Sequence, residues 1–164
     1  MSKLFGCLIN DPHLVAHVLL PFQPILYVSE AESPYGWGVT HHVHHEVLKK
    51  DVFTKRRPRQ VGELDFYKLL RDVSAHAIMG QVRKLGLGSA IPENTPPFTY
   101  RSWSCGHTGY VERFDQLRPW VLNAIPAFLK RNIKGVTDSE ALFHLFLAFL
   151  HDEGLLEGRE VAIR

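Results

Sequence analysis

The 164-residue chain contains little cysteine, no strong excess of either charge and no long apolar run. Its two cysteines, Cys7 and Cys105, are too few for a disulfide framework and lack the spacing of a metal site. A reducing cytoplasm is therefore the location that we expect.

The chain also lacks a stretch of about 18 apolar residues, the length that a membrane-spanning helix needs. Its N-terminal apolar run ends at Asn10-Asp11-Pro12, which is too short for a signal peptide. The net charge of +2 is too mild to indicate nucleic-acid binding. The basic run Lys55–Arg59 is interpreted as a solvated loop in preference to a phosphate-binding patch. We expect partners that are neither nucleic acid nor membrane.

With 45% hydrophobic and 22% charged residues, the chain is long enough to bury one sizeable core. No internal repeat divides it, so we predict a single domain over residues 1–164. Apolar patterning and turn residues predict strands and helices in alternation. The expected strands are 4–9, a hairpin within 39–54, 74–83 and 100–105, and the expected helices are 13–20, 62–73, 112–130 in two pieces broken at Pro119 and Pro126, and 137–150.

Three short segments indicate local chemistry. Two glycines flank Trp37, so a tight turn there is expected to bring the backbone close to another group. The segment Gly106-His107-Thr108-Gly109 is either a plain hairpin turn or a turn that points N–H groups at an oxyanion. Thr137-Asp138-Ser139-Glu140 is a capping box, in which Thr137 caps a helix and Glu140 reaches back.

The histidine-rich segment His41–His45, followed by Glu46, raises the alternative of a metal site. In a strand, however, His42 and His44 share one face while His41 and His45 share the other. A tetrahedral site would need further ligands from elsewhere in the chain. We favour an exposed, polar hairpin end and expect no metal or other cofactor.

Taken together, six segments in the same order resemble the class II glutamine amidotransferases, which belong to the N-terminal-nucleophile hydrolases. The likeness covers nearly the whole chain. The six segments are Met1-Ser2-Lys3-Leu4-Phe5-Gly6, Ser33-Pro34-Tyr35-Gly36-Trp37-Gly38, Gln81-Val82-Arg83, Glu93-Asn94-Thr95-Pro96-Pro97-Phe98, Gly106-His107-Thr108-Gly109 and Thr137-Asp138-Ser139-Glu140.

The resemblance implies an α+β fold, a four-layer αββα sandwich with the nucleophile at the start of a central strand. It implies that residue 2, exposed by removal of Met1, attacks the side-chain amide of glutamine. Arg83 falls where the family pairs an arginine with the substrate α-carboxylate, and Asp138 falls where it holds the α-ammonium. Gly109 and Thr108 fall at the oxyanion hole.

The chain departs from the family pattern where the chemistry takes place. Ser2 replaces the family's cysteine, and a hydroxyl is far less acidic than a thiol. Thr108 replaces the asparagine that donates to the oxyanion, and Gly86 replaces a threonine. Two functions stay open: a weakened glutaminase that uses Ser2, or an inactive relative that binds glutamine or glutamate as a sensor or regulatory subunit.

The chain also stops about a dozen residues after the helix that begins at Thr137-Asp138-Ser139-Glu140, where compact members of the family add strands. Missing strands would leave sheet edges exposed. Either the gene product is truncated, or we expect a synthase partner or a second copy of the chain to cover that edge.

Overall fold

The computed structural model describes residues 2–26, 35–43, 52–62, 64–84 and 90–157. The chain forms two compact units, Met1–Thr108 and Gly109–Arg164, and each is described by itself. The prediction of one domain over residues 1–164 stays a prediction. Within the described residues, no helix is both long and apolar enough to cross a membrane.

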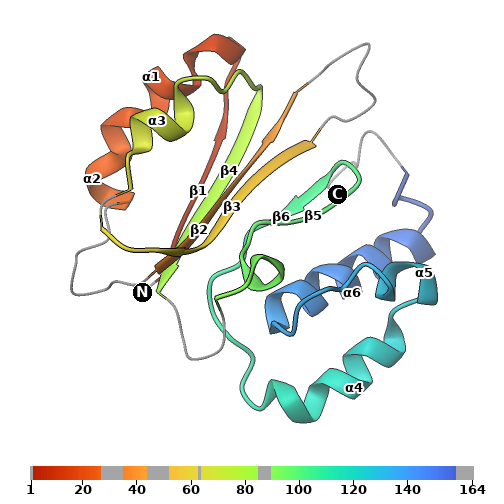
Figure 1. Cartoon of the computed structure of the whole chain (residues 1–164). Coiled ribbons are helices and arrows are strands. Elements are labelled where there is room, and N and C mark those ends of the chain that lie inside the picture. Colours follow the sequence, from red (N-terminus) through yellow and green to blue (C-terminus); the bar gives the residue numbers. More distant parts are fainter. Residues whose placement is uncertain (1, 27–34, 44–51, 63, 85–89, 158–164) are drawn as a thin grey trace. The chain divides into compact units, whose positions relative to one another are not determined.

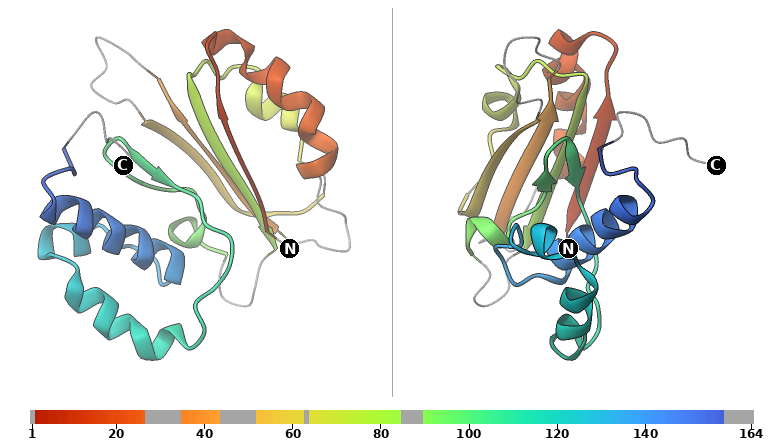
Figure 2. Two further views of the ribbon diagram at one scale, coloured as in Figure 1. Left: turned by 180° about the vertical axis from the view of Figure 1, so that it is seen from behind. Right: turned by 90° about the vertical axis from the view of Figure 1, so that its right-hand side faces the viewer.

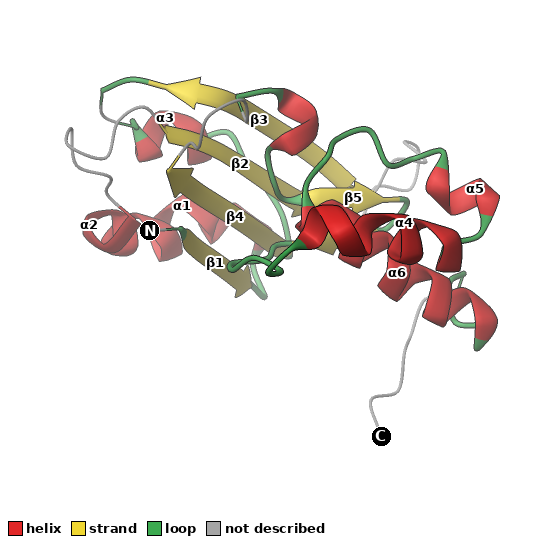
Figure 3. Ribbon diagram, turned by 90° about the horizontal axis from the view of Figure 1, so that it is seen from below, coloured by secondary structure: helices red, strands yellow, loops and turns green. Residues whose placement is uncertain are grey.

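The first unit is built on a four-stranded antiparallel sheet, in the order β1-β4-β2-β3 (Figure 3). Its strands are β1 (Lys3–Leu8), β2 (Tyr35–His42), β3 (Val52–Gln60) and β4 (Ala77–Lys84). The strands β2 and β3 pair as the hairpin that the sequence predicts, and the residues between them that carry His44 and His45 lie outside the described part.

Short helices cover one face of this sheet (Figures 1 and 2). They are η1 (Pro12–Leu14), α1 (Val15–Leu19), η2 (Leu20–Phe22), α2 (Gln23–Leu26) and α3 (Phe66–Leu70). The helix predicted over 13–20 is divided into η1 and α1, and the chain continues beyond it as η2, in whose first turn Pro21 loses no hydrogen bond.

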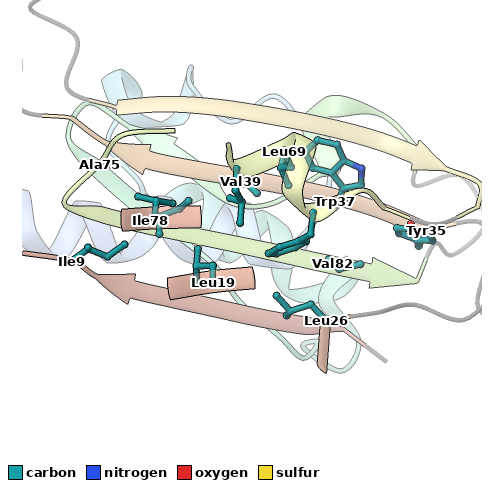
Figure 4. Close-up of a cluster of buried hydrophobic side chains, with 13 residues drawn as sticks. Ile9, Leu19, Leu26, Tyr35, Trp37, Val39, Leu69, Ala75, Ile78 and Val82 are labelled. Carbon is teal, nitrogen blue, oxygen red and sulfur yellow. The ribbon is translucent and has the colours of Figure 1, made fainter. Parts of the chain in front are cut away.

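The core of this unit lies between these helices and the sheet (Figure 4). Along β2, Tyr35, Trp37 and Val39 point into it, as alternation in a strand requires, and each is at most 5% exposed. Phe5 of β1 meets Phe66 of α3 edge to face, with ring centroids 5.7 Å apart. Burial of these large side chains is the main stabilising contribution in this unit.

A second, small sheet lies against the opposite face of the large one. Its strands, β5 (Phe98–Tyr100) and β6 (Trp103–Cys105), follow the short helix η4 (Pro92–Asn94). Several contacts hold this segment to the large sheet. Among them, Arg56 donates to the Pro97 carbonyl, His42 Nε2 lies 2.8 Å from Ser104 Oγ, and Gly106 approaches Leu4.

The second unit is helical, with α4 (Phe114–Ala124), α5 (Ala127–Lys130) and α6 (Asp138–Asp152). Thr137 caps α6 as predicted, with its hydroxyl accepting from Glu140 N at 3.3 Å. The other half of the predicted capping box is wrong. The Glu140 carboxylate accepts instead from Lys134 N at 2.9 Å and Gly135 N at 2.7 Å, and so holds the turn before the helix.

Three further sequence predictions need correction. Lys55–Arg59 is not a loop but part of strand β3, at the edge of the sheet, where charged residues and a proline discourage pairing with other chains. Residues 100–105 do not form one strand, because Arg101, at φ 51°, lies in the turn between β5 and β6. Pro119 lies inside α4, so only the break near Pro126 is confirmed.

The architecture is a mixture of helices and an antiparallel sheet, which is compatible with the predicted α+β class.

Candidate functional site

Ser2 directly precedes β1, and Arg83 lies in the neighbouring strand β4, at the same end of the large sheet. Lys3 of β1 pairs with Val82 of β4, so the residue before Lys3 and the residue after Val82 meet at this end. On the other side of β4, Gly36 is the partner of Arg83. The Ser2 residue is exposed, and the Arg83 residue is partly buried.

The Arg83 guanidinium is fixed by the chain that follows η4. Its Nη1 donates to the backbone carbonyl of Asn94 at 3.0 Å, and Asn94 is only 2% exposed. Thr95 Oγ1 closes the same turn by donating to Ile91 O at 2.8 Å. A guanidinium held in this way keeps a defined orientation, which two-point binding of a carboxylate requires.

The segment after Asn94 lies directly on strand β2. A Cβ on Gly38 would come 2.2 Å from the Pro96 carbonyl oxygen, so only glycine permits this approach. Arg56, beside Gly38 on β3, donates through both Nε and Nη2 to the Pro97 carbonyl. The close approach predicted around Trp37 is therefore confirmed, but it occurs within a strand and not at a tight turn.

Gln81 holds the turn that carries Thr108. Its side chain is 2% exposed, donates through Nε2 to His107 O at 2.7 Å and accepts through Oε1 from His107 N at 3.3 Å. Gly106 fits close to the sheet beside this pair, since a Cβ there would lie 2.5 Å from Leu4 Cδ1. One side chain thus fixes both backbone groups of the residue that precedes the exposed Thr108.

In the second unit, Asp138 connects the start of α6 to the chain after Gly109. Its Oδ2 accepts from Val111 N at 2.7 Å, and its Oδ1 accepts from Ser139 N at 2.7 Å and from the Ser139 hydroxyl at 3.2 Å. Gly109 is exposed and has a φ of 130°, a conformation that glycine adopts far more easily than other residues.

The predicted site residues therefore belong to both units. Ser2, Arg83 and Thr108 are in the first unit, where the sheet brings the first two to one end, and Gly109 and Asp138 are in the second. Sequence reasoning missed the roles of Gln81 and Arg56, whose partners lie 26 and 41 residues away. Gly86 lies outside the described residues.

Two titratable groups of the first unit, His41 and Cys105, have altered pKa values. Burial, together with the neighbouring His42, lowers the pKa of His41, whose ring stacks on Phe53 with centroids 5.5 Å apart. Burial raises the pKa of the Cys105 thiol, which makes it a poorer nucleophile at neutral pH. The described residues contain no group of three or more His, Cys, Asp or Glu side chains that could hold a metal ion, and His44 and His45 are not among them.

Comparison with known protein families gives a match that covers nearly the whole chain. The model of the family described as glutamine amidotransferases class-II matches residues 1–162. Comparisons with curated proteins and with solved structures found no significant match.

Proposed function

This chain belongs to the class II glutamine amidotransferases, and we propose that it binds glutamine and hydrolyses it slowly to glutamate and ammonia through Ser2. The observation that supports this most directly is the register of β1 and β4. It brings the start of the N-terminal strand, where the nucleophile of such an enzyme must lie, beside an arginine suited to the substrate carboxylate.

The proposed reaction begins with removal of Met1, which gives Ser2 a free α-amine. This amine, with a reference pKa of about 8, is partly neutral at physiological pH and takes the proton as Ser2 Oγ attacks the amide carbon of glutamine. The proton passes to the amide nitrogen, the C–N bond breaks, and ammonia departs. The glutamyl group then remains bound to Ser2 as an ester. Water then hydrolyses the ester to glutamate and restores the hydroxyl.

Substrate recognition is assigned to Arg83 and Asp138. Arg83 pairs with the α-carboxylate of glutamine, and Asp138 accepts from its α-ammonium group. Asp138 already accepts three hydrogen bonds from Val111 and Ser139, yet an ionised carboxylate has about four lone-pair sites and can accept one more.

The backbone N–H of Gly109 and the Thr108 hydroxyl stabilise the oxyanion. Gln81 contributes indirectly, because it fixes the peptide group of His107 next to Thr108. A hydroxyl nucleophile and a threonine donor make the reaction slower than with cysteine and asparagine. Loss of one oxyanion donor alone typically costs about 10²–10³ in kcat.

At the level of the whole chain, we propose one αββα domain of the N-terminal-nucleophile type. This proposal is supported by the first unit, which contains helices, a large sheet and the β5–β6 hairpin, the kinds of element that such a sandwich needs. We further propose a synthase partner that uses the ammonia, or association with a second copy of the chain, and the cytoplasm remains the expected location.

The test is intact-mass measurement combined with an assay for ammonia released from glutamine. We expect Met1 to be absent and ammonia to be released by the natural chain, with no release by Ser2→Ala. Ser74→Ala, outside the site, serves as the control. An intact Met1 without ammonia release would contradict the hydrolase proposal.

A second candidate is a pseudoenzyme that binds glutamine or glutamate without hydrolysis. It is favoured by the position of the departures, since Ser2 and Thr108 differ from the family whereas Arg83 and Asp138 keep the recognition residues. Calorimetry would then give binding heat that Arg83→Ala abolishes and Arg59→Ala, an exposed arginine of β3, retains. Absence of heat with both amino acids would remove this candidate.

A further inference from the structure

A cavity lies between the large sheet and the β5–β6 hairpin, at the opposite end of β1 from Ser2. Its volume is about 340 Å³. Its walls come from the last three residues of β1, the first three of β4, His42 at the end of β2 and residues 102–104 of the hairpin. All these residues are in the first unit. The size falls within the range of about 300–1,000 Å³ that is usual for small-molecule pockets.

Gly6 is the residue that keeps this cavity open. Glycine inside a strand costs stability, and it often marks a point where a ligand or another chain comes close. A Cβ built on Gly6 meets no described atom within 4 Å, and its φ is not in the left-handed region. Neither backbone conformation nor packing against the described residues therefore requires glycine here, in contrast to Gly38 and Gly106.

Two polar side chains of the wall form a pair, and the wall also contains Cys7 and Ser102. His42 Nε2 and Ser104 Oγ are 2.8 Å apart, so the Ser104 hydroxyl can form a further hydrogen bond with a group in the cavity. Most of the remaining wall is apolar and includes Met79 and Trp103. Among the described residues, none in the wall is Asp, Glu, Lys or Arg, so a charged ligand would meet no opposite charge from them.

We propose that this cavity is a binding site for a compact, neutral, mostly apolar ring compound that bears one hydroxyl group. The hydroxyl bonds to the His42–Ser104 pair, and the ring packs against Gly6 and Met79. The site is separate from the proposed glutamine site, since the register puts the cavity at the Leu8–Ala77 end of the strands and Ser2 at the Lys3–Val82 end. The proposal goes beyond glutamine chemistry and does not depend on it.

The probe for the test is 2-naphthol, titrated into the ¹⁵N-labelled full chain and followed by amide chemical shifts. We expect saturable shifts at residues 77–79 and 102–104, with a Kd on the order of 0.1 mM for a ligand of this size. The carboxylate analogue 2-naphthoate should bind more weakly, because its charge has no partner in the wall.

Two variants fill the cavity and one removes its hydrogen bond. Gly6→Leu should weaken 2-naphthol binding at least about 10-fold, since its side chain occupies the site, and Ala77→Leu provides a second filling variant if Gly6→Leu does not fold. Ser104→Ala should weaken binding about 5-fold, the usual effect of one lost neutral hydrogen bond, and Ser74→Ala should leave binding unchanged. Absence of saturable shifts, or unchanged affinity in the folded filling variant, would overturn the proposal.

Discussion

The two faces of the large sheet differ in side-chain size along the same strands. On β2, Tyr35, Trp37 and Val39 point to the helices, whereas Gly36, Gly38 and Thr40 occupy the other face. The difference shows that burial alone does not distinguish the faces, because all six residues are buried. The helix-covered face excludes water with large side chains, and the hairpin-covered face lets backbone segments come close.

The same contrast continues on β4. Ile78 and Val82 join the core, while Gln81 and Arg83 on the opposite face hold the backbone at His107 and Asn94. We therefore expect the stability of the fold to depend mainly on the helix-covered face. We expect glutamine hydrolysis to depend mainly on the hairpin-covered face. Four predictions test this separation, from the largest expected effect to the smallest.

The largest effect is expected on the helix-covered face, at Leu70. This side chain is fully buried, at 0% exposed, so Leu70→Ala should lower the free energy of unfolding by about 2–5 kcal/mol through lost burial and a cavity. Urea unfolding measures the change. Leu14→Ala, at a leucine that is 44% exposed, is the control and should cost less than about 1 kcal/mol. Equal effects at both positions would contradict the assigned core.

The next effect concerns catalysis on the hairpin-covered face. Gln81→Leu removes both hydrogen bonds to His107 and should lower kcat for ammonia release about 10²-fold, because the turn that carries Thr108 loses its support. KM should change little, since Arg83 remains. Gln60→Leu, at a glutamine whose side chain donates to the backbone of Val61, is the matched control. A loss confined to KM would show that Gln81 does not act through this turn.

Glycine substitutions test close packing on the same face. Gly38→Ala should destabilise the chain by about 1–3 kcal/mol, because the new Cβ would overlap the Pro96 carbonyl. In Gly6→Ala the new Cβ meets no described atom within 4 Å. This substitution should instead raise the free energy of unfolding by roughly 0.5 kcal/mol. Thermal unfolding of the two variants separates these cases. A large loss of stability in Gly6→Ala would mean that the space beside Gly6 is occupied.

The smallest effect is a pH dependence at His41. Its pKa is lowered in the folded chain, chiefly by burial, so below its ordinary value of 6.5 the unfolded chain binds more protons. The stabilising contribution is therefore complete above pH 6.5 and is lost as the pH falls toward the folded pKa. His41→Phe should reduce the dependence of the free energy of unfolding on pH, measured between pH 7 and pH 5, while His13→Phe should not. The difference between the two variants is the readout. An unchanged slope in His41→Phe would contradict the assignment.

Sequence reasoning predicted most of the elements but not the contacts that make the site. The β2–β3 hairpin, the strand near residues 77–84 and the Thr137 cap follow from local patterns, and these are confirmed. The charges of Lys55–Arg59 indicate exposure and predict a loop, and only the pairing with β2 reveals a strand. Gln81 has no local signal at all, since its role depends on the distant peptide group of His107.

The family was predictable for a different reason. Short motifs in a fixed order indicated it, and the family match over residues 1–162 confirms it. The roles of Ser2, Thr108, Gly109, Arg83 and Asp138 remain predictions, because each depends on a substrate.

The most direct measurement is the rate of ammonia release from glutamine by Ser2→Cys, with removal of Met1 verified by intact mass. A thiol with a pKa of about 8.5 is a far better nucleophile than a hydroxyl at neutral pH, so we predict a rise of at least about 10-fold over the natural chain. Arg83→Ala in the same background should abolish that gain. A processed Ser2→Cys chain that releases no ammonia would contradict the claim that this end of the sheet is a glutamine-hydrolysing site.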